Sequence, residues 1–250
     1  MLNHVRRGSG EPLVLIHPLG GELVVWEPVL GRLASEREVI AVDLPGFGGS
    51  PPLVNGAPAT PQVLARAVAS FLDEIGIGRA HVAGNSLGGW VALELAKAGR
   101  ALSVAGLSTA GFWKRPLGPR PGRDLRRIGQ ALLPVLPLLL RSERVRRVLL
   151  RSSVGHPDRV PPHAAARLVR AYVTSSGFEG ANEAMRSAVF SGVEQIRVPV
   201  TLAWAELDRL VRRPRETVPE WRSLVLRGCG HIPTWDDPEQ VARVLLRASG

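Results

Sequence analysis

A serine flanked by glycines stands where a strand pattern gives way to a helix pattern, and this junction constrains the fold more than any other feature. Residues 79–83 have the composition of a buried strand, and residues 89–96 place apolar side chains at helical spacing. The run 84–88 between them is Gly-Asn-Ser-Leu-Gly. A turn of this kind is sharp and strained, and only glycine leaves room for the close backbone approach. The pattern predicts a strand–turn–helix unit that exposes the hydroxyl of Ser86, although a helix-opening turn with a capping serine would have the same sequence.

Ser86 is a candidate nucleophile, because the first amides of the following helix would point at the space beside its hydroxyl. A serine hydroxyl is a poor nucleophile at neutral pH, so it needs a base, and the base needs an orienting acid. His231 is our candidate for the base, since it lies in a glycine-rich loop between a strand pattern and a helix pattern. The remaining histidines lie near the terminus, beside other strands or in a proline-rich segment: His4, His17, His81, His156 and His163.

The orienting acid should also follow the end of a strand. Asp208 comes shortly after a buried-strand pattern and is our choice, with Glu206 as the second candidate. Asp43 ends another strand, but a glycine-rich loop follows it, and we interpret Asp43 as a residue that braces this loop. The resulting chain order, Ser86, Asp208, His231, is one of the known sequential orders of a catalytic triad.

Two further segments lie after the first clear strand patterns. Residues 17–21 are His-Pro-Leu-Gly-Gly, and residues 43–50 are Asp-Leu-Pro-Gly-Phe-Gly-Gly-Ser. Together with the serine turn and the loops of Asp208 and His231, these segments resemble the α/β-hydrolase superfamily in their order and spacing. The resemblance covers residues 12–50, 80–95 and 198–246.

The resemblance implies which backbone groups would stabilise a negatively charged oxygen during catalysis. In the family, one amide comes from the histidine-led loop and the other from the residue after the nucleophile. On this chain they are the N–H groups of Leu19 and Leu87. One departure is Pro18, where the family usually has glycine. Proline removes a donor and fixes φ, which bears on the shape of the loop and leaves the Leu19 amide in place.

The alternation of strand and helix patterns predicts an α/β fold. We expect a mostly parallel central sheet of about seven strands with helices on both faces, such as the helix pattern at 61–75. The segment 111–190 breaks this alternation, because it contains eight prolines and no convincing strand. The resemblance implies that this segment is an inserted helical cap over the active site. The expected domains are therefore a core of residues 1–110 and 191–250 and a cap of residues 111–190.

Charge also separates the segment 111–190 from the rest of the chain. It holds 15 basic and 5 acidic residues, whereas the rest holds 17 of each, so the whole net charge of +10 lies in the segment. This charge could attract anionic acyl substrates or an acidic membrane surface, with the apolar run 131–140 as a contact face. The alternative is a solvated helical face, since 30 of the 32 basic residues are arginine and indicate compositional bias.

The run 131–140 is our prediction for the roof of a substrate pocket, although packing between cap and core is an equal alternative. Three residues are our candidates for the pocket lining: His17, Trp113 and Leu136. The other tryptophans fit core or cap packing better.

Composition limits the remaining function classes. The chain lacks an apolar stretch of the ~20 residues that span a membrane. The lone Cys229 excludes an internal disulfide, suits a cytoplasmic location, and fits a small loop filler better than a nucleophile. The motifs of metal, phosphate-loop and dinucleotide sites are missing, so we expect neither metal nor cofactor. The basic segment lacks the interleaved aromatics typical of nucleic-acid binding, and the oligomeric state is open.

These observations predict a cofactor-independent serine hydrolase that acts on a small-molecule acyl substrate, with ester hydrolysis as the leading reaction. A serine at the turn argues against the aspartate-dependent dehalogenase and epoxide-hydrolase branches of the resembled family. The alternative enzyme is a carbon–carbon bond hydrolase that cleaves a diketone-like acid with the same triad. A non-catalytic ligand receptor that retains the triad is the alternative from another class.

Overall fold

The computed structural model describes residues 1–119, 125–216 and 218–250. Its centre is a seven-stranded sheet with the strand order β1-β3-β2-β4-β5-β6-β7. Only β1 is antiparallel to its neighbour among the described strands, and the others pair in parallel. The predicted α/β sheet is confirmed. The strands are β1 (His4–Arg7), β2 (Pro12–Ile16), β3 (Glu38–Val42), β4 (Ala80–Asn85), β5 (Ala101–Leu107), β6 (Val200–Ala205) and β7 (Arg222–Leu226).

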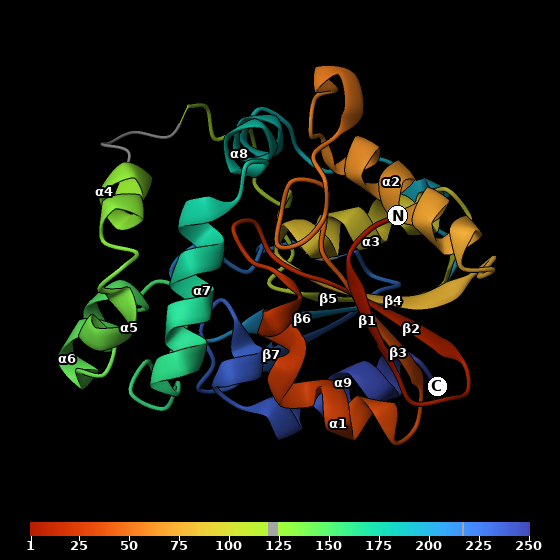
Figure 1. Ribbon diagram of the computed structural model, residues 1–250. Coiled ribbons are helices and arrows are strands. Elements are labelled where there is room, and N and C mark those ends of the chain that lie inside the picture. The colour runs from red at the N-terminus through yellow and green to blue at the C-terminus, as the bar shows by residue number, and fades with distance from the viewer. Residues whose placement is uncertain (120–124, 217) are drawn as a thin grey trace.

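Helices cover both faces of this sheet (Figure 1). One face carries α2 (Pro61–Glu74) and α3 (Leu87–Lys97), and the other carries α1 (Glu27–Ala34) and α9 (Pro238–Ala248). Local sequence fixes where these helices begin. Thr60 accepts a hydrogen bond from the N–H of Val63 and caps α2, and Asp237 caps α9 in the same way through Gln240. Each capped helix has proline as its first residue, where no N–H is needed.

Each face of the sheet packs into its own apolar core. Every residue of β4 is buried, and so are four of the five residues of β2, as expected for strands that are covered on both faces. The carboxyl ends of the parallel strands meet at one edge of the sheet, so the loops that follow β2, β4, β6 and β7 lie close together there.

The segment 111–190 lies between β5 and β6 and is called the insertion below. Its described part contains helices and no strand, as the sequence predicts. The helices are α4 (Leu125–Ala131), α5 (Leu136–Leu139), α6 (Glu143–Leu149), α7 (Pro162–Thr174) and α8 (Phe178–Arg186). Figure 1 shows two layers: α7 and α8 lie next to the core, and α4, α5 and α6 lie beyond α7. We call the first pair, with the loop 153–156, the inner layer and the other three helices the outer layer.

The apolar run 131–140 has two sides. Leu136 and Leu140 are buried, whereas Leu132 and Leu138 are exposed, so the run packs on the inner layer with only part of its apolar surface. None of the helices in the described part of the chain is long and apolar enough to cross a membrane.

Two arginines of the outer layer are buried and hold backbone. Arg126 binds the carbonyls of Tyr172 and Val173 at the end of α7 and forms an ion pair with Glu179. Arg146 binds the carbonyl of Leu140 at 2.8 Å. These two guanidinium groups stabilise helix ends, since a helix leaves its last carbonyls without partners. Both arginines are therefore buried and are not among the solvent-exposed charges of the insertion.

Candidate functional site

The turn at 84–88 has the geometry that the sequence predicts. Ser86 has φ 55° and ψ −114°, a conformation that non-glycine residues rarely adopt, and it stands directly before α3. A Cβ atom on Gly84 would collide with the carbonyl of Gly88, and one on Gly88 would collide with the carbonyl of Ile16. The N–H of Ser86 donates to Leu107 at 2.8 Å, which ties the turn to the end of β5. Close packing on both sides therefore holds Ser86 in its strained conformation.

The structure brings Asp208 and His231 together. Nδ1 of His231 donates to Oδ2 of Asp208 at 2.8 Å, and both side chains are almost fully buried. The other carboxylate oxygen accepts the N–H groups of Leu210 and Val211 at 2.7 and 2.9 Å. Burial raises the pKa of Asp208, but His231 and these two amides outweigh burial and hold the pKa below its usual value. An ionised Asp208 places the imidazole proton on Nδ1 and leaves Nε2 free to accept another proton.

Asn85 joins this pair to the serine turn. Its amide group donates to the carbonyl of His231 at 2.9 Å and to the carbonyl of Leu107 at 3.0 Å. The His231 backbone is therefore held against the residue next to Ser86. Among the described residues the Ser86 hydroxyl makes no hydrogen bond, and catalytic hydrogen bonds commonly tighten only with substrate bound. Sequence reasoning missed Asn85, although a polar residue at the end of a wholly buried strand was a signal.

The two other carboxylates considered from the sequence have different partners. Glu206 is exposed and accepts the N–H of Gly228 at 2.8 Å, so it holds the loop after β7. Asp43 is buried and accepts the N–H groups of Leu23 and Gly49 at 2.7 and 2.8 Å. The interpretation of Asp43 as a loop brace is confirmed.

His17 is also a brace. Its side chain is fully buried, Nε2 accepts the N–H of Leu44 at 2.9 Å, and Nδ1 donates to the carbonyl of Pro18 at 2.8 Å. Burial lowers the pKa of His17, so the ring is neutral, as these two bonds require. Both nitrogens are occupied by backbone, and the ring has no surface open to a substrate. These contacts oppose the predicted pocket role, because a histidine of this kind fixes two loops to each other.

The loop after β2 and the start of α3 lie side by side. Gly88 packs on the backbone of Ile16 and His17, and the N–H of Gly21 donates to Pro18 at 2.9 Å to close the loop. Pro18 accommodates this turn because only its carbonyl takes part. The N–H groups of Leu19 and Leu87 donate no hydrogen bond within the described residues, as expected of a helix start and of a loop that receives an anion. Their catalytic role stays a prediction.

Comparison with known proteins identifies the family. The model of the alpha/beta hydrolase family matches residues 13–244, which is nearly the whole chain. The chain belongs to the alpha/beta hydrolase family. A solved esterase from Thermogutta terrifontis has the same fold, with a TM-score of 0.76 and 22% identity over 98% of this chain and 92% of the esterase.

Two curated relatives show different chemistries on similar sequences. The epoxide hydrolase EphH of Mycobacterium tuberculosis is 31% identical over 73% of this chain and 92% of its own length. The dihydrolipoyllysine-residue acetyltransferase component of an acetoin cleaving system from Pseudomonas putida is 28% identical over 95% of this chain. The chain spans 63% of that component's length. Membership of the alpha/beta hydrolase family therefore does not by itself determine the reaction.

Two predicted pocket residues of this alpha/beta hydrolase hold the insertion in place. Nε1 of Trp113 donates to the carbonyl of Ala188 at 2.7 Å, and its ring packs edge-on against Trp90. Leu136 is buried in the apolar core that α7 shares with the sheet. The packing alternative is supported for both, and their role toward substrate stays a prediction.

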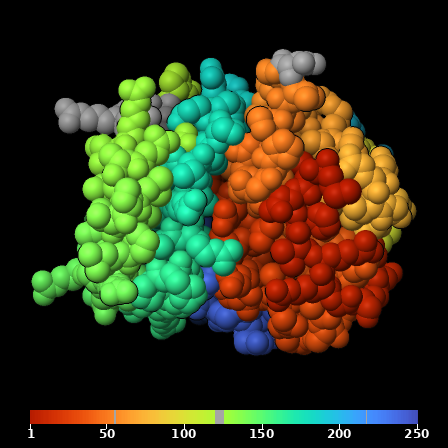
Figure 2. Space-filling model, in the orientation of Figure 1, coloured from red at the N-terminus to blue at the C-terminus, as the bar shows by residue number. Residues whose placement is uncertain are grey.

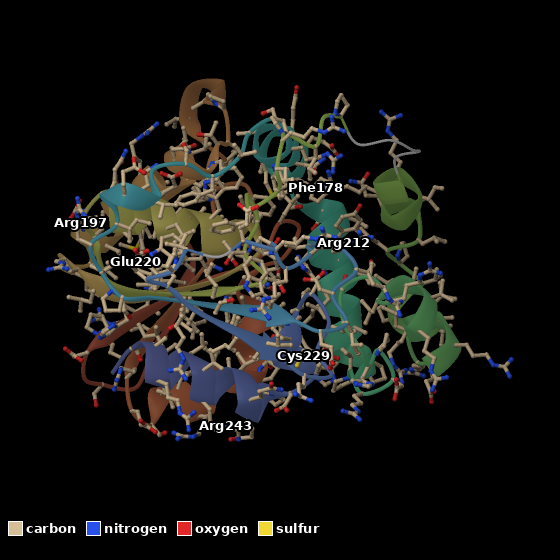
Figure 3. All side chains as sticks on the ribbon, turned by 180° about the vertical axis from the view of Figure 1, so that it is seen from behind. Phe178, Arg197, Arg212, Glu220, Cys229 and Arg243 are labelled. Carbon is tan, nitrogen blue, oxygen red and sulfur yellow. The ribbon has the colours of Figure 1, made fainter. Side chains whose placement is uncertain are left out.

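Cys229 is a buried thiol on the loop after β7 (Figure 3). Burial and the nearby Asp236 raise its pKa to about 12, so the thiolate is absent at neutral pH. This favours the loop-filler interpretation over a nucleophile. The described residues hold no cluster of three metal-ligating side chains.

The inner layer of the insertion contacts the loops of the candidate site directly. The N–H of Gly177 donates to the carbonyl of Gly46 at 2.9 Å, in the loop that follows β3. Gly20, in the predicted oxyanion loop, has φ +72°, and a Cβ there would lie 2.8 Å from Tyr172 and 3.2 Å from Phe178. Figure 3 shows Phe178 near the junction of α7 and α8. The inner layer therefore closes over the carboxyl edge of the sheet, and Ser86 is 4% exposed.

Asp236 anchors the inner layer to the His231 loop. One carboxylate oxygen accepts the N–H groups of Gly155 and Gly230 at 2.8 and 2.7 Å, and the other accepts the N–H of His156 at 2.8 Å. The side chain is buried. Sequence reasoning missed Asp236, because its partners in the insertion lie about 80 residues away along the chain.

Proposed function

We propose that this chain is a serine hydrolase that cleaves a carboxylic ester, with Ser86, His231 and Asp208 as its triad. The observation that carries the proposal is the buried His231–Asp208 pair, held at 2.8 Å and tied by Asn85 to the residue beside Ser86. Base, acid and nucleophile therefore come from three strand ends that meet at one edge of the sheet.

The proposed reaction has two halves. Nε2 of His231 takes the proton of Ser86 as the serine oxygen attacks the ester carbonyl, and Asp208 stabilises the imidazolium. The N–H groups of Leu19 and Leu87 stabilise the oxyanion, which collapses as the alcohol leaves with the proton from His231. Water then attacks the acyl-serine and gives a proton to His231, which passes it to the Ser86 oxygen as the carboxylic acid is released. The insertion acts as the cap that excludes water from the closed site.

A carbon–carbon bond hydrolase with the same triad is the second candidate. The observation that favours it is the net charge of +10 in the insertion, which would attract an anionic diketone-like acid. The relationship to EphH makes an epoxide a further substrate to include in the test. Ser86 at the turn argues against this third chemistry, because the epoxide-hydrolase branch forms its ester on an aspartate. A receptor without catalysis would bind ligand and turn over none of these substrates.

A substrate panel with active-site labelling tests the proposal. The panel contains p-nitrophenyl esters of graded chain length, a vinylogous diketone acid and a simple epoxide. We expect ester turnover and fluorophosphonate labelling that mass spectrometry locates at Ser86. If Ser86 were labelled but no ester were turned over, or if only the diketone were turned over, the proposed esterase activity would be rejected in favour of another hydrolase activity. Absence of labelling in folded protein would favour the receptor.

Variants test the three roles. Ser86→Ala should lower kcat by roughly 10³-fold or more, and Asp208→Asn should also lower it strongly because an amide favours the wrong imidazole tautomer. Ser108 is a matched control, since it is the other non-glycine residue with positive φ in the described chain and directly follows the neighbouring strand β5. Ser108→Ala and Glu206→Gln should keep kcat within about tenfold. A Ser86→Ala protein as active as Ser108→Ala would refute the nucleophile assignment.

A further inference from the structure

The outer layer of the insertion exposes an unusual amount of apolar surface. Fourteen large apolar side chains are exposed in the described residues, and seven of them lie between residues 128 and 149. We call these seven the outer apolar face, with exposed fractions from 37% to 67%. They are Ile128, Leu132, Val135, Leu138, Leu139, Val148 and Leu149. Monomeric proteins seldom gather apolar side chains in this way without a partner surface.

Helical geometry aligns two pairs of these side chains. The N–H of Leu132 donates to Ile128, and the N–H of Leu139 donates to Val135, so the two residues of each pair lie one helical turn apart. Leu136 and Leu140 are instead buried, in the apolar cluster that also contains residues of α7. Figure 2 shows the outer layer as the green column at the left edge of the molecule, away from the core. The outer apolar face therefore stays exposed in the folded insertion, while Leu136 and Leu140 pack.

Exposed arginines accompany the outer apolar face. Arg127, Arg141, Arg144, Arg147 and Arg151 are exposed, whereas Glu143 is the single acidic residue among positions 125–151. Of these five arginines, only Arg147 forms an ion pair within the described structure, with Glu143 in the next helical turn. Arg147 and Arg151 also line a surface pocket with Arg209 and one carboxylate, Asp158. Arg209 donates to the carbonyl of Arg151 at 2.9 Å. Guanidinium groups with free donors bind phosphate oxygens well.

We propose that the outer layer docks on an anionic lipid surface. The outer apolar face would enter the boundary between headgroups and acyl chains, and the five arginines would contact lipid phosphates. Charge complementarity selects this partner over a second copy of the chain, because joining two such faces would bring ten arginines together against two glutamates. The inference does not depend on the proposed catalytic roles, since none of these residues belongs to the candidate site.

Vesicle co-sedimentation tests the proposal. Full-length protein is mixed with vesicles of phosphatidylcholine alone, or of phosphatidylcholine with phosphatidylglycerol, at low and physiological ionic strength. We expect binding to the anionic vesicles to be roughly tenfold or more stronger than to the neutral ones, and to weaken as salt screens the arginines. Equal sedimentation with both vesicles, or with neither, would overturn the proposal.

Two sets of variants separate the apolar and charged contributions. The apolar variant carries Leu132→Gln, Leu138→Gln and Val148→Gln, and its control carries Val54→Gln and Val225→Gln, which are exposed elsewhere. The charge variant carries Arg127→Gln, Arg141→Gln and Arg144→Gln. Its control removes three exposed arginines outside the insertion, Arg66, Arg222 and Arg243, the last of which lies on α9 (Figure 3).

Both outer-layer variants should lose most vesicle binding, and both controls should retain it. A control that loses as much binding as its partner would show a non-specific effect of net charge or hydropathy and would overturn the proposal. Sedimentation velocity tests whether a second copy of the chain binds the outer apolar face instead. A dimer in wild type that the apolar variant abolishes would assign the outer apolar face to a second copy and would refute lipid docking. Unchanged circular dichroism in every variant excludes unfolding as the cause.

Discussion

The inner layer of the insertion packs closely on the core, whereas the outer layer leaves many of its side chains exposed. The inner layer lies so close to the core that glycine is needed on both sides, as where Gly177 donates to Gly46 and where Gly230 packs on Gly155. The outer layer instead leaves leucines and arginines in solvent. The same contrast separates the arginines: Arg126 and Arg146 hold backbone carbonyls, whereas Arg144 has no acidic partner in the described structure.

This difference shows that the position of an insertion residue decides whether it contributes to the fold or remains available for another task. Contacts of the inner layer reach the loops of Asp43, of Leu19 and of His231, so a change there should alter stability and catalysis together. Changes on the outer apolar face should leave both unaltered, because these side chains contribute little buried area. Four predictions test this contrast, from the largest expected effect to the smallest.

Gly46→Ala should have the largest effect. Gly46 has φ +80°, and an added Cβ would lie 2.8 Å from the backbone nitrogen and Cα of Gly177. Left-handed strain and overpacking together should cost about 2–4 kcal/mol of unfolding free energy. The matched control is Gly180→Ala on α8, where no atom lies within 4 Å of the added Cβ and alanine should stabilise the helix by about 0.5–1 kcal/mol. Urea unfolding measures both. Equal stability of the two variants would mean that the inner layer does not touch the core as described.

Asp236→Asn should lower both stability and activity. The best arrangement of an amide keeps its oxygen toward Gly155 and Gly230 and turns its NH₂ group toward the N–H of His156, which loses its acceptor. An unpaired buried donor costs about 1–3 kcal/mol. Because Gly230 precedes His231, we expect kcat to fall while the labelling site stays at Ser86. Asp237→Asn is the control, since asparagine caps a helix as well as aspartate does. Wild-type kcat in Asp236→Asn would show that the hydrogen bonds of Asp236 do not position His231.

Acid should weaken the Asp208 contribution in a predictable direction. The folded pKa of Asp208 lies below its unfolded value, so its stabilisation is present above about pH 4 and is lost as pH falls through the folded pKa. The difference in unfolding free energy between wild type and Asp208→Asn should therefore be largest near neutral pH and shrink toward pH 3. The outer-layer variant Leu138→Gln should show a difference that does not change with pH. An increase in this free-energy difference between wild type and Asp208→Asn at acid pH would contradict the lowered pKa of Asp208.

Leu138→Gln should have the smallest effect. Leu138 is 64% exposed, whereas Leu140, two residues along the chain, is fully buried. Leu138→Gln should change the unfolding free energy by less than about 0.5 kcal/mol, but Leu140→Ala should cost about 2–5 kcal/mol. Thermal unfolding of the pair measures the contrast within a single short segment. A large loss in Leu138→Gln would mean that the outer apolar face already has a partner within this chain.

The local sequence predicts the core of this protein well, because each of these features depends on only a few neighbouring residues. The glycines around Ser86 specify the turn, and Asp208 and His231 could be chosen because they follow strands whose ends share one edge. The role of Asp43 as a brace also follows from the glycine-rich loop beside it.

The remainder depends on contacts between distant parts of the chain. His17 was predicted to line a pocket, but its position in the sequence cannot show that both ring nitrogens bind the backbone of Pro18 and Leu44. Asn85 and Asp236 act on partners that are 146 and about 80 residues away. Helical spacing in the run 131–140 likewise cannot show which side packs, because both sides are apolar.

The two ends of the insertion lie next to each other. The N–H of Phe190 donates to Gly111 at 2.9 Å, and the N–H of Leu117 donates to Arg186 at 2.8 Å. A bridge on the order of three residues could therefore replace the segment between Gly111 and Phe190 without separating β5 from β6. The insertion thus leaves and re-enters the core at one place. An insertion from a related hydrolase could be grafted at this junction, provided that it replaces the contacts that Gly177 makes with Gly46 and that Gly155 makes with Asp236.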